Sequence, residues 1–434
     1  MSDVINIGLL GLGTVGRGVW QLLERPNDVI TNRLGCRLKI KKILVRDPAK
    51  ERGVDIPASL FITDAREILD DDDIQIVVEV IGGTLLARQA VNQALAAGKS
   101  VVTANKELMA NFGQEVMEEA ERRGADLFFE ASVGAGIPII QPLKVSLVGN
   151  RIQRVMGIIN GTTNFILSKM DDGQGYEAAL AEAQALGYAE RDPADDIEGK
   201  DAAAKIAILA SIAFNSRVTA GQVHTEGISA VSAKDIMYAR ELGYAVKLLA
   251  VAKLDDGSKS SGIDVRVHPA MIPLDHPLAA VTEAYNAIFV EGDAAGELMF
   301  FGQGAGSLPT AGAVVADVVL AADNIQRSTA GRLGCTCFNS WPIRPIDEVE
   351  SSFYILIEAM DRPGVLAQIA KVFGDHQVSI GNVIQKQTEQ GLAEVVFMTH
   401  RVVEGNLRSA LDQIAALDVV DKVRNVIRVE VGQT

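Results

Sequence analysis

One segment of the chain places acidic residues and a lysine at a spacing that could perform acid–base chemistry. Residues 187–205 read GYAERDPADDIEGKDAAAK, with carboxylates at Glu190, Asp192, Asp195, Asp196 and Glu198. In the helix expected next, Asp201 and Lys205 stand four residues apart and share one face. Alanines separate them and apolar residues follow, so the Lys205 ammonium should be partly buried, where it needs a partner or a chemical task. By itself this pattern favours a structural ion pair, because ion-pair networks imitate active sites; the rest of the sequence reverses that preference.

A glycine-rich turn near the start of the chain indicates a nucleotide site. An apolar segment at residues 4–10 leads into Gly11-Leu12-Gly13-Thr14-Val15-Gly16, and a helical pattern follows at residues 17–24. In such a turn the first glycine permits the tight bend, the second admits a pyrophosphate, and the third lets the helix pack on the strand. The helix N-terminus then offers N–H groups to the phosphates. A nicotinamide dinucleotide is the expected ligand, and a turn without a ligand is the less favoured alternative.

Alternating strands and helices extend this turn into a doubly wound Rossmann sheet. Strands are expected at residues 40–45, 74–80, 100–103 and 127–130, and helices at 87–97 and 107–123. Ligands of such sheets bind beyond the carboxyl ends of the strands, so Ile81, Gly82 and Lys106 are candidate cofactor contacts, and Lys106 is expected where nicotinamide and substrate meet. Arg46, after the second strand, suits the 2′-phosphate of NADP. The adjacent Asp47 leaves NAD open, and Arg46 fits equally well as a solvated charge.

Composition excludes several classes of protein. The 434 residues are 48% hydrophobic and 22% charged, which is typical of a soluble globular protein with two or three domains. A formal net charge of −15 disfavours nucleic acid or an anionic membrane as partner. Three cysteines are too few for a disulfide framework, and the spacing of Cys335 and Cys337 does not resemble a redox CxxC pair. No signal peptide or membrane span is evident, so a cytoplasmic location is expected.

Three loops in the middle of the chain could hold ligands. Residues 130–138 combine one carboxylate with small residues whose carbonyls could bind a monovalent cation, although a hinge between domains is the favoured interpretation. Residues 160–164, NGTTN, begin a helix whose N-terminus could bind a substrate carboxylate or only be capped by its own side chains. Residues 302–310 form a second glycine-rich loop before an apolar helix, residues 311–322. If that helix returns to the Rossmann sheet, both glycine loops line one cofactor cleft; a plain interdomain turn is the alternative.

The C-terminal part of the chain has the pattern of a ferredoxin-like module. A linker at residues 332–350 contains prolines, and the order strand, helix, strand, strand, helix, strand follows. The expected ranges are 353–358, 364–373, 378–385, 393–399, 407–417 and 423–431. The turn Asp361-Arg362-Pro363-Gly364 precedes the first helix, whose N–H groups would suit the carboxylate of an amino acid.

Taken together, these motifs resemble those of the bacterial monofunctional homoserine dehydrogenases that carry a C-terminal ACT domain. The resemblance covers essentially the whole chain and rests on GLGTVG at 11–16, TANK at 103–106, EASVGAGIPII at 130–140, NGTTNFIL at 160–167, DPADDIEGKDAAAK at 192–205, GQGAG at 302–306 and DRPG at 361–364. It implies an α/β and α+β multidomain fold. A Rossmann NAD(P)-binding domain would span 1–137 plus about 304–330, a catalytic and dimerisation domain 138–303, a linker 331–350 and a ferredoxin-like ACT domain 351–434.

The resemblance also implies a reaction, the reduction of L-aspartate 4-semialdehyde to L-homoserine by NADPH or NADH in threonine, methionine and isoleucine biosynthesis. Lys205 matches the proton donor to the carbonyl oxygen, Asp201 its partner, and Lys106 the second lysine of the site. This agrees with the chemistry of the residues, because reduction of an aldehyde builds alkoxide charge that an ammonium stabilises and protonates. The remaining matched positions are Glu190, Asp196, Gly161 and Thr162 for substrate, and Gly11, Gly13, Thr14, Val15, Gly16 and Gly306 for cofactor.

By the same resemblance, a structural sodium site maps on Glu130, Val133, Ala135 and Ile137, and a feedback effector, expected to be threonine, on Asp361, Gly364, Val365, Leu366 and Asn382. A homodimer or homotetramer is expected. Two other interpretations remain. A different Rossmann–ACT dehydrogenase, such as an arogenate or prephenate dehydrogenase, would not explain Lys106 together with Lys205. A nucleotide- and amino-acid-sensing regulator would leave the lysine helix unexplained.

Overall fold

The computed structural model describes the chain apart from residues 1–3, 26–27, 256–260, 333, 388–390 and 431–434. Residue 431, the expected end of the last strand, therefore lies outside the described residues. The chain divides into two compact units: Met1–Val155 with Ala204–Gln222 and Asn286–Ser340, and Met156–Ala203 with Val223–Tyr285 and Trp341–Thr434.

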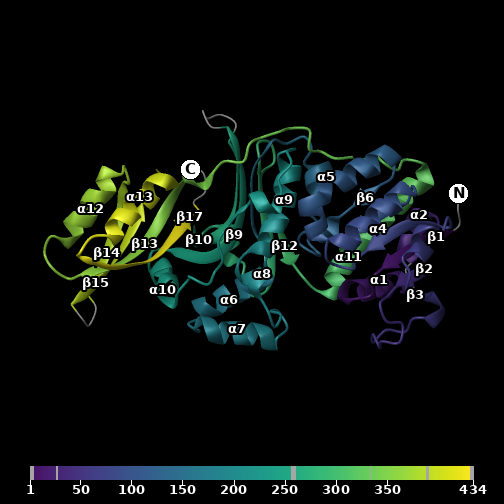
Figure 1. The fold of residues 1–434 in the computed structure, drawn as a ribbon, viewed down its shortest axis with the longest axis horizontal. Helices are drawn as coiled ribbons and strands as arrows, with labels where there is room; N and C mark the ends of the chain where they lie inside the picture. The colour runs from purple at the N-terminus through teal and green to yellow at the C-terminus, as the bar shows by residue number, and fades with distance from the viewer. Residues whose placement is uncertain (1–3, 26–27, 256–260, 333, 388–390, 431–434) are drawn as a thin grey trace. The chain divides into compact units, whose positions relative to one another are not determined.

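The first unit is built on a six-stranded parallel sheet in the order β3-β2-β1-β4-β5-β6, which confirms the Rossmann prediction (Figure 1). All four residues of β5 and five of the six in β4 are buried, as is typical of a parallel sheet covered on both faces. The strands are β1 Val4–Leu10, β2 Arg37–Leu44, β3 Phe61–Ile62, β4 Ile74–Glu79, β5 Ser100–Thr103 and β6 Leu127–Phe128.

Helices cover both faces of this sheet. Three of them share a core with β1 and β2, and α4 packs against α5 away from that core. The helices are α1 Thr14–Glu24, α2 Asp28–Leu34, α3 Arg66–Leu69, α4 Leu85–Ala96, α5 Lys106–Arg123 and α11 Ser307–Arg327. Two further strands of this part of the chain are β11 Tyr285–Gly292 and β12 Gly296–Gln303. A π-helical segment, η3, covers Pro142–Ser146, and β7 covers Ile152–Ile158.

Helix α11 returns to the Rossmann sheet, as the second glycine loop suggested. It lies against α1, where a Cβ on Gly18 would stand 2.6 Å from the Ser307 carbonyl oxygen and 2.8 Å from Ala311 Cβ, so only glycine permits this approach. By length and composition α11 could cross a membrane, which contradicts the expectation that no stretch comes near a membrane span. Among the described residues it is the one such helix. Val314 and Val318 are buried in the sheet's core, and this packing accounts for its apolar composition.

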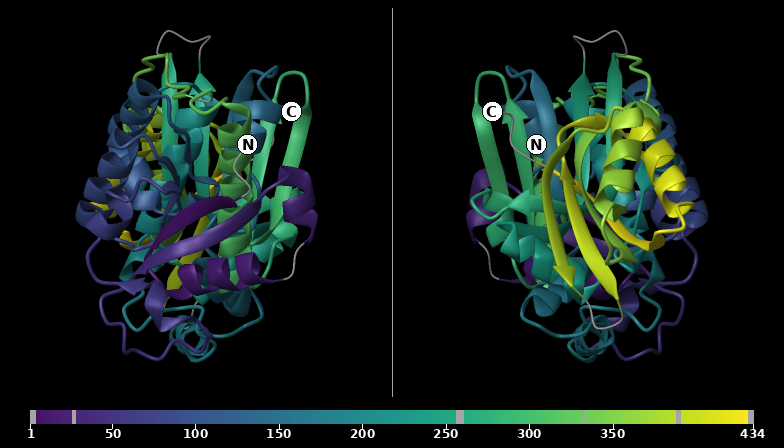
Figure 2. Two further views of the ribbon diagram at one scale, coloured as in Figure 1. Left: turned by 90° about the vertical axis from the view of Figure 1, so that its right-hand side faces the viewer. Right: turned by 90° about the vertical axis from the view of Figure 1, so that its left-hand side faces the viewer.

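The second unit contains an extended sheet in which the neighbours are β9, β10, β17, β13, β15 and β14. The last four have the strand order of a ferredoxin-like module, and α12 and α13 cover one face of them, as the right-hand view of Figure 2 shows. The bounds are β13 Glu350–Met360, α12 Val365–Asp375, β14 Ile380–Gln387, β15 Leu392–Thr399, β16 Val402–Val403, α13 Glu404–Ala415 and β17 Val420–Val429. This confirms the predicted order βαββαβ.

Strand β9, Tyr244–Asp255, was not among the expected strands. Its sequence, YAVKLLAVAKLD, is a nearly continuous apolar run without alternation, yet it pairs along its whole length with β10, Gly262–Pro273. Strand β8, His224–Thr225, adds to β10 in parallel. The remaining helices are α6 Gly161–Asp171, α7 Tyr176–Ala185, α8 Ala194–Ile197 and α10 Ala233–Glu241, together with α9 Lys200–Ala213, whose residue range is shared by the two units.

Candidate active site

The glycine-rich turn after β1 has the geometry that a dinucleotide requires. Gly11 has φ 103°, and a Cβ there would stand 2.8 Å from the Val80 carbonyl oxygen. A Cβ on Gly16 would stand 2.3 Å from the Gly11 carbonyl oxygen, so neither position accepts a side chain. A Cβ on Gly13, in contrast, would meet nothing within 4 Å. The backbone at Gly13 is thus open to a ligand at the N-terminus of α1, which has no side-chain cap.

The second glycine loop lies directly against the first. Gly306 is the N-cap of α11 with φ 118°, and Ser307 Oγ donates a hydrogen bond of 2.6 Å to the carbonyl oxygen of Thr14. The structure thus brings the loops that carry Thr14 and Gly306 together, as one cofactor site lined by both would require. Val15, on the first turn of α1, packs against the Rossmann core.

The carboxyl ends of β2 and β4 frame the same turn. The Gly11 N–H donates to the Leu44 carbonyl oxygen at 3.2 Å, and Arg46, two residues beyond, is exposed. Ile81 and Gly82 follow β4, and the Ile81 N–H donates to Glu79 Oε1 at 2.9 Å. These placements match the edge of the sheet at which a dinucleotide is expected.

A buried hydrogen-bonded chain fixes the start of α5, where Lys106 is the first helical residue. Thr103 Oγ1 donates to Glu79 Oε2 at 2.6 Å and accepts from the Asn105 N–H at 3.0 Å. The Asn105 side chain caps Leu108 N–H and donates to the Gly83 carbonyl oxygen at 2.6 Å. Burial raises the pKa of Glu79, against the hydrogen bond from Thr103. Sequence reasoning missed the role of Glu79, although a carboxylate in the apolar strand IQIVVE was the available signal.

The acidic segment meets the N-terminus of α6 through one amide. Asn160 caps α6 by accepting from the Thr163 N–H at 2.9 Å. Its Nδ2 atom donates to Asp196 Oδ1 at 2.7 Å and to Asp201 Oδ2 at 2.9 Å. Two of the predicted carboxylates are therefore brought together by a residue that the sequence pattern indicated only as a cap. The position of Asn160 in NGTTN, ahead of a helix, did not indicate that its side chain also donates to the two carboxylates.

The first turn of α6 also holds the segment that carries Glu190. Thr162 Oγ1 donates to the Tyr188 carbonyl oxygen at 2.7 Å, and the Phe165 and Tyr188 rings lie 5.0 Å apart. Glu190 follows two residues later and is exposed. Within the described part of the chain, the N–H groups of Gly161 and Thr162 donate to no protein acceptor, since the cap serves the next residue. Carboxylates and open N–H groups thus occur at the same helix end.

Helix α9 carries the two residues predicted to do proton chemistry. Asp201 is 7% exposed, and Lys205, one turn later, is half-buried in a helix whose other residues from 202 to 211 are all buried. Both residues have polar partners. A lysine in such a helix stands in the low-dielectric surroundings where its charge acts strongly on a neighbouring group.

The loop after β6 uses the side chain of its one carboxylate to hold backbone N–H groups. Glu130 is buried, and its two oxygens accept the backbone N–H groups of Ile139, Ile140 and Gln141 at 2.5–2.8 Å. The carbonyl oxygens of Val133, Ala135 and Ile137 accept no hydrogen bond from the described residues. They are hard oxygen ligands, and in that respect the loop fits a monovalent cation. No group of three or more His, Cys, Asp or Glu side chains suited to a metal occurs among the described residues.

The predicted effector residues are only partly gathered at one place. Gly364, with φ 90°, is the N-cap of α12, and Leu366 on its first turn is 39% exposed. Val365 belongs to the core of the module, so only its backbone can face a ligand. Asn382 is exposed in β14, but it is Gln385 of that strand that donates to Asp361 Oδ1, at 3.3 Å.

Comparisons with known proteins agree along the chain. Family models described as "Homoserine dehydrogenase, NAD binding domain", "Homoserine dehydrogenase" and "ACT domain" match residues 11–130, 138–319 and 353–419. A homoserine dehydrogenase of Synechocystis is 45% identical over 98% of this chain and 99% of its own. The crystal structure of a homoserine dehydrogenase from Thiobacillus denitrificans is 42% identical, covers 98% of both chains and has a TM-score of 0.91.

A hyperthermophilic archaeal homoserine dehydrogenase solved in complex with NADPH is 28% identical over 73% of this chain and 97% of its own, with a TM-score of 0.60. The nucleotide-binding geometry of the glycine loops, the ferredoxin-like module and the full-length relatives lead to one conclusion. The chain belongs to the homoserine dehydrogenase family of NAD(P)-dependent oxidoreductases and carries a C-terminal ACT domain.

Proposed function

We propose that this chain reduces L-aspartate 4-semialdehyde to L-homoserine with NADPH or NADH. The observation that carries the proposal is the Asn160 amide, which ties Asp196 and Asp201 to the start of α6. An amino acid presents an ammonium and a carboxylate, and this place offers carboxylates beside open helix N–H groups. A substrate of that chemistry fits better than an uncharged alcohol.

Each proposed role follows from the position of its residue. Asp196 and Glu190 bind the substrate ammonium, and the N–H groups of Gly161 and Thr162 bind its carboxylate. The bound nicotinamide supplies the hydride. Lys205 stabilises the growing alkoxide charge and then donates its proton to that oxygen, and Asp201, one helical turn away on the same face, is its partner. Lys106 adds a second positive charge near the reacting groups, held by the Asn105 cap.

The cofactor is proposed to lie over Gly13, with its pyrophosphate at the N-terminus of α1 and at Gly306. Exposed Arg46 favours NADP, because a guanidinium can pair with a 2′-phosphate. The comparison of NADPH and NADH dissociation constants, with Arg46→Ala as the variant, tests this preference. Loss of discrimination in the variant supports it; an unchanged ratio contradicts it.

Three finer parts of the proposal rest on separate observations. A sodium ion would be held by the carbonyls of Val133, Ala135 and Ile137, with Glu130 ordering the loop, and its role would be structural. Self-association into a homodimer or homotetramer is favoured by exposed Met299 and Phe301 on β12, and light scattering tests it. The cytoplasm is the proposed location.

The ACT domain is proposed to bind threonine as a feedback inhibitor at the start of α12. Gly364→Glu places bulk and negative charge at this helix start, where an effector carboxylate would bind. The variant should keep its activity and lose inhibition. If threonine still inhibits it fully, the effector site lies elsewhere.

The test of the main proposal is the absorbance of the nicotinamide after protein, NADPH and aspartate 4-semialdehyde are mixed, with and without threonine. Rapid oxidation slowed by threonine supports both the reaction and the effector. Oxidation of arogenate or prephenate with NAD⁺, without reaction of the semialdehyde, would favour the other dehydrogenases. Binding of both ligands with no turnover would favour a sensor.

A further inference from the structure

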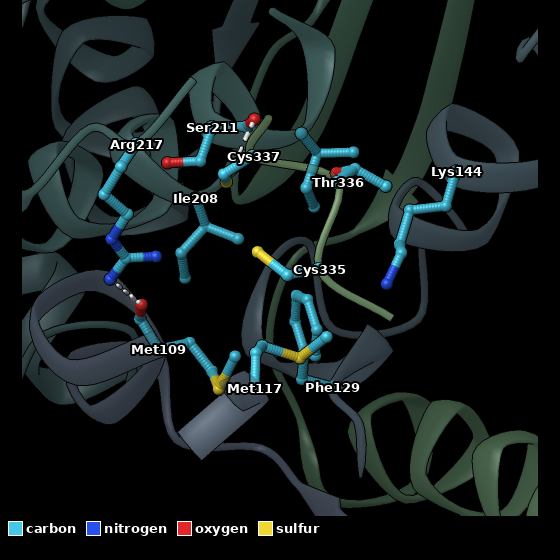
Figure 3. Close-up of a pocket in the computed structure, with 11 residues that line it drawn as sticks. Met109, Met117, Phe129, Lys144, Ile208, Ser211, Arg217, Cys335, Thr336 and Cys337 are labelled. Carbon is cyan, nitrogen blue, oxygen red and sulfur yellow. Dashed lines mark hydrogen bonds between the residues drawn. The ribbon is translucent and has the colours of Figure 1, made fainter. Parts of the chain in front are cut away.

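A small pocket in the first unit lies behind the two helices that carry the proposed catalytic lysines. It has a volume of about 30 Å³, enough for a molecule the size of water or hydrogen peroxide. Its walls come from α5, which begins at Lys106, from the second half of α9, which carries Lys205, and from the segment Cys335–Cys337 (Figure 3). Any change in this pocket therefore acts on both helices.

Two cysteine side chains line this pocket. Cys335 and Cys337 are separated by one residue, and both are half-buried. Cys337 Sγ also lies 3.7 Å from the Ser211 carbonyl oxygen of α9, to which it donates. Figure 3 shows the Cys335 sulfur directed into the pocket and Cys337 beside Ser211. The CxC spacing gave no sign of a redox pair, because it differs from CxxC, but the fold places both side chains at the wall of one pocket.

Two half-buried cations face the same space. Lys144 Nζ donates to the Gly334 carbonyl oxygen at 3.2 Å, and Arg217 donates to the Met109 and Ala110 carbonyl oxygens of α5 at 3.0 and 3.4 Å. Glu121 is the nearby acidic group, and it accepts from the Cys335 N–H. Because the hydrogen-bond partners of these two cations are neutral carbonyls, their charges remain available to stabilise an anion in the pocket.

These surroundings give the two sulfurs different properties. The neighbouring Cys337 side chain, supported by the Lys144 charge, lowers the pKa of Cys335 to about 6, against burial and Glu121. The neighbouring Cys335 side chain and burial raise the pKa of Cys337 above its ordinary value. Cys335 is therefore the thiol that ionises more readily, which suits an attacking cysteine, and Cys337 suits a resolving one.

We propose that Cys335 and Cys337 form a peroxide-sensitive dithiol site whose oxidation lowers the activity of the enzyme. The Cys335 thiolate attacks one peroxide oxygen, the O–O bond breaks, and the second oxygen leaves as water after protonation. Cys337 then attacks the sulfur of the Cys335 sulfenic acid, a second water leaves, and a disulfide remains. The two thiols supply the two electrons that reduce one peroxide to two waters.

Oxidation changes the pocket in two ways. The disulfide removes the thiol hydrogen that Cys337 donates to Ser211 of α9, and it removes the thiolate opposite Lys144 and Arg217. Arg217 remains bonded to α5, so the lost thiolate reaches that helix through Arg217, while α9 loses the hydrogen bond at Ser211. A disulfide that encloses a single residue is strained, and strained disulfides are the readily reduced, regulatory kind. The switch is therefore reversible by thiols.

The test exposes the reduced full-length protein to hydrogen peroxide. Peptide mapping after differential alkylation identifies the oxidised sulfurs, and NADPH oxidation with aspartate 4-semialdehyde measures turnover. The expected result is a Cys335–Cys337 disulfide, a fall in rate of about fivefold or more, and recovery of both with dithiothreitol. Cys36, which is 3% exposed in the Rossmann core, serves as the internal control and should stay reduced.

Three variants separate the steps. Cys335→Ser should keep its activity under peroxide. Cys337→Ser should stop at a sulfenic acid on Cys335 that dimedone labels. Lys144→Gln, which keeps both thiols, should slow the labelling of Cys335. The proposal is overturned if Cys335 reacts no faster than Cys36, or if complete disulfide formation leaves turnover unchanged.

Only the turnover measurement rests on the proposed function. Absence of turnover in the reduced protein with either cofactor would contradict that function, while sulfur mapping and NADPH binding would still report on the dithiol site.

Discussion

Two groups of charged residues in the second unit differ in the charge of their partners. In the first, at the junction of β10 and β17, every charge lies beside its opposite and all but Lys253 are buried: Arg266 donates to Asp264 at 2.6 Å and to Glu430, and half-buried Lys253 donates to Glu430 at 2.7 Å. Arg266 is 0% exposed. In the second, at the start of α6, Asp196 is half-buried and its partner is the neutral amide of Asn160. We infer that charges paired with an opposite charge within the protein stabilise the fold. Charges whose partners in the protein are neutral groups are the ones that bind a ligand.

His268 shows how completely the first group is balanced. Its Nε2 accepts from Arg266 at 3.0 Å and its Nδ1 donates to the Pro269 carbonyl oxygen at 2.8 Å, so the ring is neutral. Burial and the two nearby arginines hold the pKa of His268 well below its ordinary value. A neutral ring of this kind does not titrate in the physiological range, which suits a structural role.

The largest effect on activity is expected from Lys205→Ala. The rate of semialdehyde reduction should fall by about two to four orders of magnitude, because the variant lacks the proton donor. NADPH binding and the melting temperature should hardly change. Lys200→Ala is the matched control, since Lys200 lies on the same helix but is exposed beside Glu198. Equal rates in the two variants would remove Lys205 from the mechanism.

Glu430→Ala should have the opposite effect. It leaves Arg266 buried with one carboxylate fewer, and breaking a buried pair costs about 3–5 kcal/mol of unfolding free energy. Turnover per folded molecule should be retained. Chemical denaturation measures the loss, with Asp375→Ala in the exposed Lys371–Asp375 pair as the control and Glu430→Gln as a milder variant. A normal stability of Glu430→Ala would show that the buried group is not structural.

Asp196→Asn tests the second group by itself. The amide keeps the shape but loses the charge, so the KM for the semialdehyde should rise about 10- to 100-fold, as for one charge-assisted hydrogen bond. The melting temperature should not fall. Asp195→Asn, at the adjacent exposed position, should match the unchanged protein. An unaltered KM for Asp196→Asn would place the substrate ammonium elsewhere.

Lowering the pH should reduce, by a small amount, the stability that paired carboxylates of this unit contribute. Burial works to raise the pKa of Glu226, but hydrogen bonds from His224 and Arg428 outweigh it and hold that pKa below its ordinary value. A carboxylate with a depressed pKa contributes stability above its unfolded pKa and loses it as the pH falls below that value. Melting temperatures between about pH 6 and pH 3 should therefore fall less steeply for Glu226→Gln than for the parent. Parallel curves would exclude this contribution.

The sequence predicted the parts of the fold that depend on local patterns. Gly11, Gly13 and Gly16 stand where a strand meets a helix, and apolar runs mark the parallel strands, so the Rossmann domain followed from neighbouring residues. The βαββαβ order of the last module was equally local. Strand β9 was not predicted because it is buried on both faces, and its sequence therefore lacks the alternation of apolar and polar residues that identifies a strand.

The candidate site was predictable only as a set of separate motifs. Nothing in NGTTN indicates that Asn160 reaches Asp201, 41 residues later, and the charges on β10 gave no sign of a partner at Glu430, 164 residues away. Asn382 was expected at the effector site, but the alternation of β14 directs Gln385 to Asp361. Such pairings depend on how distant strands and helices come together, which single-sequence patterns do not contain.

The pairing of β10 with β17 has a consequence for how this protein can be divided. Ala270 and Met271 pair in parallel with Arg428 and Val429, so the last strand of the ACT module completes the sheet of the neighbouring region. Cutting the chain in the linker would remove this strand and unpair β10 at Ala270 and Met271, and an unpaired strand edge is a template for aggregation. It would also remove Glu430, which forms ion pairs with Arg266 and Lys253. The ACT domain is therefore part of this sheet, and a chain that ended before it would need a redesigned edge at β10 to avoid aggregation.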